Sequence, residues 1–266
     1  FAVIVTSGML ILAVCAYKIL QGGIAREAFE KCMRYAVLYA LAGLLAVMGS
    51  GHLQAQQVAH MQPMKLASME ALWESADPAP LAAMAVIDVK NERNTMEVNI
   101  PYLLSFMVYN QPSGEIKGIH ALQQQYEQQY GPGDYKPDIP GLFVSFRGMA
   151  GVGGLMLLLA GLTGLLAWKK KLAAHRMFLR LLILALPLPF IANSLGWYLT
   201  EAGRQPWIVV GLQKTAAAFS PNLTPGEVFI SLMGFTIIYL ILAAAALYAA
   251  VRFIRRTPAA DDRRDA

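Results

Sequence analysis

The chain has 266 residues, of which 56% are hydrophobic and only 15% are charged, and its mean hydropathy is +0.45. Soluble domains carry about 25% charged residues, so this composition is typical of an integral membrane protein. The formal charge of +5 comes from short clusters of Lys and Arg beside apolar segments, which disfavours a nucleic-acid-binding face.

Two features of the chain narrow its class further. Cys15 and Cys32 lie in or beside apolar segments, so they provide neither a disulfide framework nor a thiolate zinc site. The chain begins at Phe1 within apolar sequence, without the charged region or cleavage site of a secretory signal. We therefore expect that an upstream piece is absent.

Five apolar stretches approach or exceed the length of about 20 residues that crosses a bilayer as a helix. We predict helices over residues 1–20, 35–52, 141–168, 176–200 and 227–251. The expected fold class is therefore an all-α integral membrane protein, a bundle of five transmembrane helices with a long extracytoplasmic loop between the second and third. The predicted organisation is 1–52 for the first two helices, 53–140 for the loop, 141–256 for the last three helices and 257–266 for a tail.

Basic residues gather in the first connection, the third connection and the C-terminal tail. These clusters are Lys18, Arg26, Lys31 and Arg34; Lys169, Lys170, Lys171, Arg176 and Arg180; and Arg252, Arg255, Arg256, Arg263 and Arg264. Because short cytoplasmic segments of membrane proteins carry an excess of Lys and Arg, we expect all three clusters in the cytoplasm. The N-terminus and the long second connection then lie outside, and the C-terminus inside.

The segment 53–140 is too long for a simple connection. It contains the run QQQYEQQYGPGDYKPDIP, whose Pro and Gly residues disfavour long regular structure. Residues 61–73 and 100–108 carry enough apolar side chains to pack, and ordered loops of this length are usually functional. We expect the segment to fold over the outer mouth of the bundle, and the alternative is a disordered spacer.

The sharpest local signal is GWYLTEAGRQPW, at the end of the fourth predicted helix. Glu201 and Arg204 lie three residues apart on one helical face, and ionisable residues in membrane segments are costly. This carboxylate is suited to ligate a metal or heme iron, to relay protons, or simply to pair with Arg204 at the membrane surface. Trp197 lies on nearly the same face, whereas Trp207 is expected to be an interfacial anchor.

Two other segments contain candidate residues. The third predicted helix begins with FVSFRGMAG, a Gly-rich stretch that permits close approach of a neighbouring helix or a flat cofactor. Arg147 there suits a propionate or lipid headgroups, and a Met such as Met149 is ordinarily core filler. Lys65 and Glu70 in MKLASMEALW can present polar groups to an amphiphilic substrate, and the ordinary alternative is a solvated ion pair.

Several enzyme classes lack support in the sequence. The four histidines, His52, His60, His120 and His175, show no paired metal-ligand spacing such as HExxH. The chain also has neither a GxxxxGK[ST] phosphate loop nor a GxSxG nucleophile elbow. Zinc enzymes, ATPases and hydrolases are therefore disfavoured.

Taken together, these motifs resemble subunit I of cytochrome bd-type quinol oxidases, over the C-terminal half of that family's subunit. GWYLTEAGRQPW is the most specific element, and MKLASMEALW, IPYLLSF, GEIKGIHAL and VSFRGMAG follow the family's order. The resemblance implies that the outer segment is a quinol-binding loop in which Lys65 and Glu70 take part in quinol oxidation. Release of the two quinol protons from this outer loop would separate charge across the membrane.

The resemblance also implies heme b as cofactor. It implies that Glu201 is an axial ligand of the high-spin heme b, with Trp197 close to the hemes, and that Met149 is an axial ligand of the low-spin heme b. Arg147 would lie beside that heme, and the charges of Arg147 and Arg204 would tune the heme potentials. A thioether ligand raises the potential of heme iron, and an anionic carboxylate lowers it.

The sequence departs from the family in two places. The low-spin heme of the family has a His ligand near the outer end of the first helix present here, where this chain has Val3. His52, at the outer end of the second predicted helix, is a candidate replacement. The family's first four helices, which carry ligands of the oxygen-reducing heme d, have no counterpart, so heme d is expected only on a partner chain or a missing segment.

We therefore expect a heme b-binding subunit of a bd-type respiratory complex in a bacterial or archaeal plasma membrane, not catalytically complete alone. Its expected partners are the quinone pool and further membrane chains, resembling the N-terminal half or subunit II of the family. The alternative is a structural anchor subunit that kept the fold but lost the low-spin heme, with Val3 as its main evidence. A transporter ranks last, because the predicted helices contain few polar groups at mid-membrane.

Overall fold

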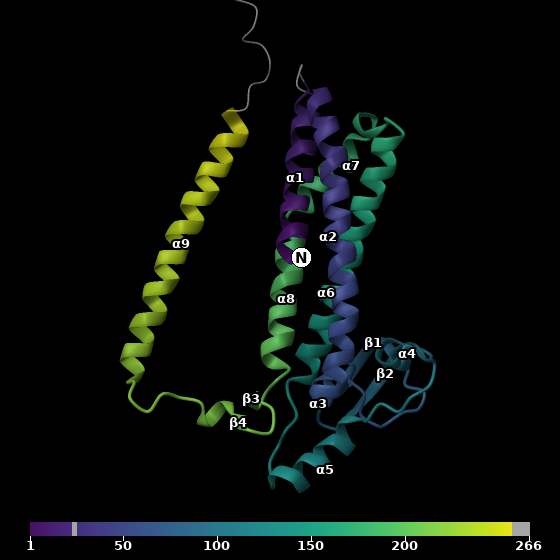
Figure 1. The fold of residues 1–266 in the computed structure, drawn as a ribbon, viewed down its shortest axis with the longest axis vertical. Coiled ribbons are helices and arrows are strands. Elements are labelled where there is room, and N and C mark those ends of the chain that lie inside the picture. Colours follow the sequence, from purple (N-terminus) through teal and green to yellow (C-terminus); the bar gives the residue numbers. More distant parts are fainter. Residues whose placement is uncertain (23–25, 257–266) are drawn as a thin grey trace, which may run out of the picture.

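The computed structural model describes residues 1–22 and 26–256, and the predicted tail 257–266 lies outside the described residues. The fold is a helical membrane bundle with a folded segment at one end, and Figure 1 shows this arrangement. The five predicted membrane helices are confirmed. They are α1 (Ala2–Gln21), α2 (Arg26–Met61), α6 (Ile139–Trp168), α7 (Arg176–Leu184) continued by α8 (Leu188–Ala202), and α9 (Pro225–Arg256).

The second helix is longer than its apolar stretch predicts. Helix α2 has 36 residues, which at 1.5 Å per residue is about 54 Å, well beyond a hydrocarbon core of about 30 Å. The two ends of α2 are polar, with Arg26 and Glu30 at one end and a Gln-rich turn at the other. Hydropathy alone therefore predicts only the apolar middle of the helix. The C-terminal part of α2 therefore supports the segment 53–140 beyond the apolar stretch of the helix.

The fourth predicted helix is interrupted near its middle. Helix α7 ends at Leu184 and α8 begins at Leu188, with Pro187 between them and Pro189 in the first turn of α8. Proline lacks the amide hydrogen that a helix interior requires, so the chain turns here and starts a new helix. The short 3₁₀ helix η1 (Leu172–Ala174) connects α6 to α7.

The core of the bundle is formed by α1, α2, α6 and α7. Gly8 permits α1 to approach α2 closely, since a Cβ at this position would lie 2.9 Å from the Cβ of Ala40. Met9, Leu12 and Met33 are among the fully buried side chains at this contact. The helix hairpin thus provides a rigid frame for the rest of the bundle.

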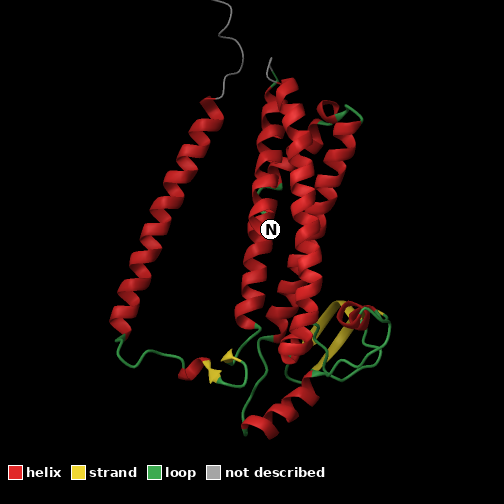
Figure 2. Cartoon of the chain, in the orientation of Figure 1, coloured by secondary structure: helices red, strands yellow, loops and turns green. Residues whose placement is uncertain are grey.

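The segment 53–140 is folded, as predicted, and packs on the end of the bundle (Figure 2). It contains α3 (Pro63–Met69), β1 (Leu81–Asp88), β2 (Arg93–Ile100), α4 (Leu103–Tyr109) and α5 (Ile119–Tyr130), and β1 and β2 form an antiparallel hairpin. The two stretches predicted to pack correspond to α3 and α4. The hairpin was not predicted, and the Gln-rich run is helical up to Gly131, which has a left-handed φ of 94°.

Helix α9 stands apart from the bundle in Figure 1, at the far end of the connection that follows α8. That connection contains the short strands β3 (Trp207–Val209) and β4 (Gln213–Lys214) and the 3₁₀ helix η2 (Thr215–Ala217). None of the apolar window of α9 is buried by the described residues. The apolar surface of this helix is therefore left exposed by the described residues.

Candidate functional site

The short helix α3 lies at the centre of the candidate site. Every residue from Met64 to Met69 is buried, because α3 packs between the start of α6, the end of α8 and the rest of segment 53–140, called the outer segment after its expected side of the membrane. Lys65 is 8% exposed and Glu70 is 3% exposed. The solvated ion pair considered for these two residues is therefore wrong, since both are buried and each has different neighbours.

Glu70 pairs with Arg147 of α6. The Arg147 Nη2 donates to the Glu70 Oε2 at 2.7 Å, and Nη1 donates to the carbonyl oxygen of Met69 at 2.5 Å. Nε donates to the carbonyl of Ala82 on β1 at 3.0 Å, and the guanidinium lies 3.9 Å from the centre of the Phe143 ring. Arg147 thus binds two parts of the outer segment to α6, and its donors are directed to the loop.

The second oxygen of Glu70, Oε1, is buried without a hydrogen-bond partner. Glu70 also lines a polar cavity of about 350 Å³ that contains three more carboxylates, those of Glu74, Glu92 and Glu97. Burial raises the pKa of Glu70 to about 7, although the neighbouring Arg147 opposes this shift. A carboxyl with this pKa exchanges protons near neutral pH, as a general base requires.

Lys65 faces the opposite neighbour, the end of α8. The structure gives its ammonium no hydrogen bond within the described residues, and its aliphatic stem packs at the position of Gly203, where a Cβ would lie 2.9 Å from Lys65 Cε. Burial and the charge of Arg204 lower the pKa of Lys65, whereas Glu201 raises it. Lys65 is therefore electrostatically coupled to both charged residues of the GWYLTEAGRQPW segment.

Glu201 and Arg204 form an ion pair at the end of α8, and each side chain is 36% exposed. The structure thus brings together the two residues that the sequence places on one helical face. Trp197, one turn earlier, is 69% exposed. The Glu201 carboxylate is therefore only partly covered by the described residues.

An apolar cavity of about 660 Å³ lies between α1, α2, α6 and α8, within the usual size range of ligand sites. Met149 and Trp197 line it, as do two methionines that sequence reasoning missed, Met48 and Met156. Gly153 also lines the cavity, and a Cβ there would meet no atom within 4 Å. An apolar space with thioether donors and an open glycine wall fits a flat group such as heme.

His52 and Val3 do not line this cavity. The Nε2 of His52 lies 2.9 Å from Oδ1 of Asn110 and 3.2 Å from Nε2 of Gln56, so its described contacts tie α2 to the end of α4. Val3 is 79% exposed. The residues of α1 that do line the cavity carry no imidazole, and Met48 lies one helical turn before His52 on the cavity side of α2.

Trp207 is not the interfacial anchor that was expected from the sequence. It is buried, not exposed at a membrane interface, and its ring stacks on Tyr135 with centroids 5.7 Å apart. Tyr130 packs edge-on against the same indole at 5.0 Å. The aromatic cluster fastens the chain after α8 to the outer segment, a long-range contact that sequence spacing does not reveal.

Comparisons with known proteins identify relatives of this chain. A family model described as "Cytochrome bd terminal oxidase subunit I" matches residues 1–258. The chain is 41% identical over 269 residues to "Cytochrome bd ubiquinol oxidase subunit 1" of Bacillus subtilis (strain 168), covering 100% of this chain and 57% of that protein. It is 29% identical over 316 residues to "Cytochrome bd-II ubiquinol oxidase subunit 1" of Escherichia coli (strain K12), covering 96% of this chain and 60% of that protein.

A solved structure is also similar. "The structure of bd oxidase from Geobacillus thermodenitrificans" matches with a TM-score of 0.77 and 27% sequence identity, covering 96% of this chain and 56% of that chain. The chain therefore spans a little over half the length of the relatives it matches.

The Arg147–Glu70 ion pair is expected to hold the outer segment on α6, and this can be tested by mutation. Breaking a buried ion pair typically costs about 3–5 kcal/mol, so Arg147→Gln should loosen α3 and β1 from α6. We expect limited proteolysis within 53–140 to accelerate by about tenfold or more. The charge-matched control is Lys90→Gln, at an exposed position of the hairpin. Equal proteolysis of the two variants would show that Arg147 does not hold the segment.

Proposed function

This chain belongs to the cytochrome bd terminal oxidase subunit I family, and from that premise we propose that it is a heme b-binding membrane subunit that takes part in quinol oxidation. The observation that carries the proposal is the position of α3. One end of this buried helix holds Lys65 near Glu201 and Arg204. The other end holds Glu70, which pairs with Arg147. Arg147 lies two residues before Met149 in the sequence. The quinol residues and both candidate ligand segments therefore share one packed unit.

The proposed cofactor residues follow from donor chemistry. Met149 would hold a low-spin heme b through its thioether in the apolar cavity, and Glu201 would hold a high-spin heme b through its carboxylate, with Trp197 and Arg204 beside it. Heme b, when bound, supplies one-electron redox chemistry. The ion pair with Arg204 orients the Glu201 carboxylate at the end of α8.

Glu70 has the properties of the proton acceptor for quinol. Its unpaired Oε1 is free to accept the hydroxyl proton, and the adjacent polar cavity with Glu74, Glu92 and Glu97 provides a route for that proton toward water. The Lys65 ammonium, with a lowered pKa, would donate a hydrogen bond to a quinol oxygen. Both groups are buried, so little competing water surrounds them.

The arrangement of charges supports an orientation. The ends of α1, α6 and α9 and the starts of α2 and α7, which carry the basic clusters, lie at one end of the bundle, and the outer segment lies at the other (Figure 1). We infer from the excess of Lys and Arg that the first end faces the cytoplasm. Quinol protons released at the loop then leave on the outer side.

Further membrane chains are part of the proposal. The exposed apolar surfaces of α8 and α9 suit contact with other transmembrane segments, and the matched relatives contain additional sequence. An oxygen-reducing heme d is assigned to such a segment or chain. The alternative role, a structural anchor without the low-spin heme, is favoured by one observation, the absence of an imidazole from the described residues that line the cavity.

The first test is cofactor content. Glu201→Ala should remove one heme b per chain from the purified complex, since the variant lacks the proposed carboxylate ligand. The measurement is pyridine hemochrome quantification with a dithionite-reduced minus oxidised spectrum. Glu115→Ala, at an exposed loop position, is the control. Unchanged heme content in Glu201→Ala would exclude Glu201 as an essential ligand.

The second test uses the pKa of Glu70. Because burial raises this pKa to about 7, the carboxylate that accepts a proton is populated only as pH rises through that value. Quinol-dependent heme reduction should therefore increase between about pH 5 and pH 8. Glu70→Gln should lower the rate by about 100-fold, abolish this dependence and retain heme. A variant with the original pH profile would contradict the assignment, and Glu115→Gln is the control.

The third test concerns the second axial ligand. Since Met48 lines the cavity and His52 contacts Asn110 instead, Met48→Leu should alter the low-spin heme b absorption band and His52→Ala should leave it unchanged. The reduced-minus-oxidised spectrum of each variant is the measurement. Loss of the band in His52→Ala would identify His52 as the ligand. A parent complex without any low-spin band would support the structural-anchor alternative.

A further inference from the structure

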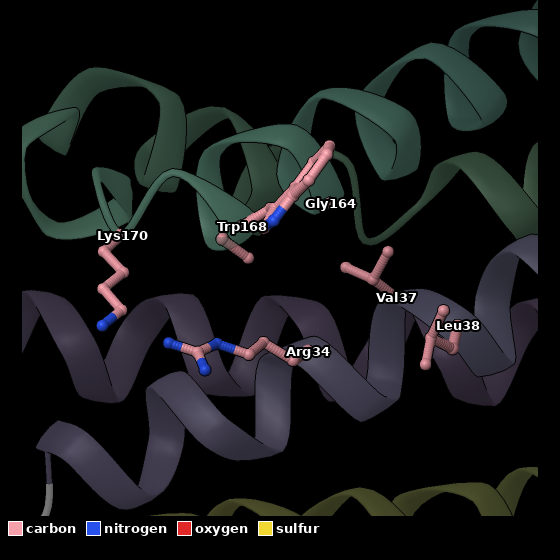
Figure 3. A pocket seen from close by; sticks show the side chains of 7 residues that line it. Arg34, Val37, Leu38, Gly164, Trp168 and Lys170 are labelled. Atoms are coloured by element: carbon pink, nitrogen blue, oxygen red, sulfur yellow. The ribbon is translucent and has the colours of Figure 1, made fainter.

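A second cavity lies at the other end of the bundle, between the first turns of α2 and the last turns of α6 (Figure 3). Its volume is about 340 Å³. It is lined by Arg34, Val37, Leu38, Gly164, Ala167, Trp168 and Lys170. None of these residues belongs to the candidate redox site.

The two cations of this cavity lie at the same end of it, and the apolar residues Val37 and Leu38 lie at the other (Figure 3). Within the described residues, neither Arg34 nor Lys170 has a hydrogen bond or ion pair from its side chain. Glu30, one turn before Arg34, is paired with Arg26 at 3.0 Å. The lining residues include no acid, so two positive charges face one space uncompensated.

The backbone at Lys170 strengthens this observation. Helix α6 ends with the amide of Lys171 donating to the carbonyl of Leu166 and that of Lys170 donating to Ala167, the pattern of a Schellman motif. Lys170 occupies the position of this motif that glycine usually fills, with a left-handed φ of 54°. A side chain is disfavoured there, yet this position carries a Lys whose ammonium reaches the cavity.

The wall of the cavity is apolar and open to the side of the bundle. Gly164 has no side chain, which leaves α6 close to Val37 of α2, and a Cβ at Gly164 would lie 3.1 Å from Val37 Cγ1. Trp168 is 84% exposed at the end of α6, where an indole suits the interface between headgroups and acyl chains. The cavity thus joins an apolar groove along the helices to a cationic end at their termini.

We propose that this cavity binds one anionic phospholipid, with its phosphate between Arg34 and Lys170 and the start of an acyl chain along Val37, Leu38 and Gly164. Basic pockets between transmembrane helices on the cytoplasmic side are suited to anionic headgroups. A quinol has no anionic headgroup to match the two cations, and a free phosphate would leave the apolar groove unused. Charge complementarity and the groove together favour an anionic phospholipid.

The test compares lipid binding by the purified complex that contains this chain. After delipidation, dioleoylphosphatidylglycerol, dioleoylphosphatidylcholine and inorganic phosphate are each titrated, and bound molecules are counted by native mass spectrometry. The variant Arg34→Gln/Lys170→Gln is compared with the charge-matched Lys171→Gln/Arg180→Gln, whose residues lie at the same end but outside the cavity. A lipid-dependent rise in the thermal unfolding temperature is the second measurement.

We expect the cavity variant to lose one tightly bound phosphatidylglycerol, with affinity lowered by about 30-fold for the removal of two basic residues, and the control to retain it. Phosphatidylcholine and inorganic phosphate should not occupy this site. Equal losses in both double variants would indicate diffuse surface charge and overturn the proposal. Equal binding of phosphatidylcholine, competition by inorganic phosphate at similar affinity, or no anionic preference in the parent complex would overturn it as well.

Discussion

The guanidinium of Arg147 is the contact on which the outer half of the structure depends. It neutralises a carboxylate that is 3% exposed and donates to carbonyls of two loop elements, so it fixes α3 and β1 to the membrane helix that carries Met149. Without this cation, Glu70 would be buried without a counter-charge, and the free energy of burial would favour its protonated form. The same ion pair therefore stabilises the loop and limits the rise in the pKa of Glu70 that burial causes.

The helices were predictable because bilayer-length apolar runs and basic flanks leave few alternatives. Glu201 and Arg204 were predictable for the same local reason, since helical spacing alone places them together. Contacts over long sequence separations were not predictable. Nothing in the spacing of MKLASMEALW indicates that Lys65 and Glu70 serve different neighbours, or that Trp207 stacks on Tyr135, because such pairs are decided by tertiary packing.

The surroundings of the two candidate heme ligands, Met149 and Glu201, differ in how much of them this chain provides. The cavity around Met149 is lined by four helices of this chain, and its glycine wall and methionines are already in place. Glu201, in contrast, does not line that cavity and is 36% exposed, and Trp197 lines the cavity but is 69% exposed. A buried, low-dielectric environment at Glu201 would have to come from neighbouring segments, which accords with a chain that spans little more than half of its relatives.

The length of α2 has a consequence for how the protein responds to its bilayer. A continuous helix of about 54 Å extends well past the hydrocarbon layer and leads directly into α3, which is itself anchored to α6 and α8. Thinning or thickening of the membrane is therefore accommodated by tilt of the whole unit or at the long connection to α9, where packing is sparse. The distance from the outer site to the membrane helices is therefore fixed by the protein, whereas the height of that site above the lipid varies with bilayer thickness.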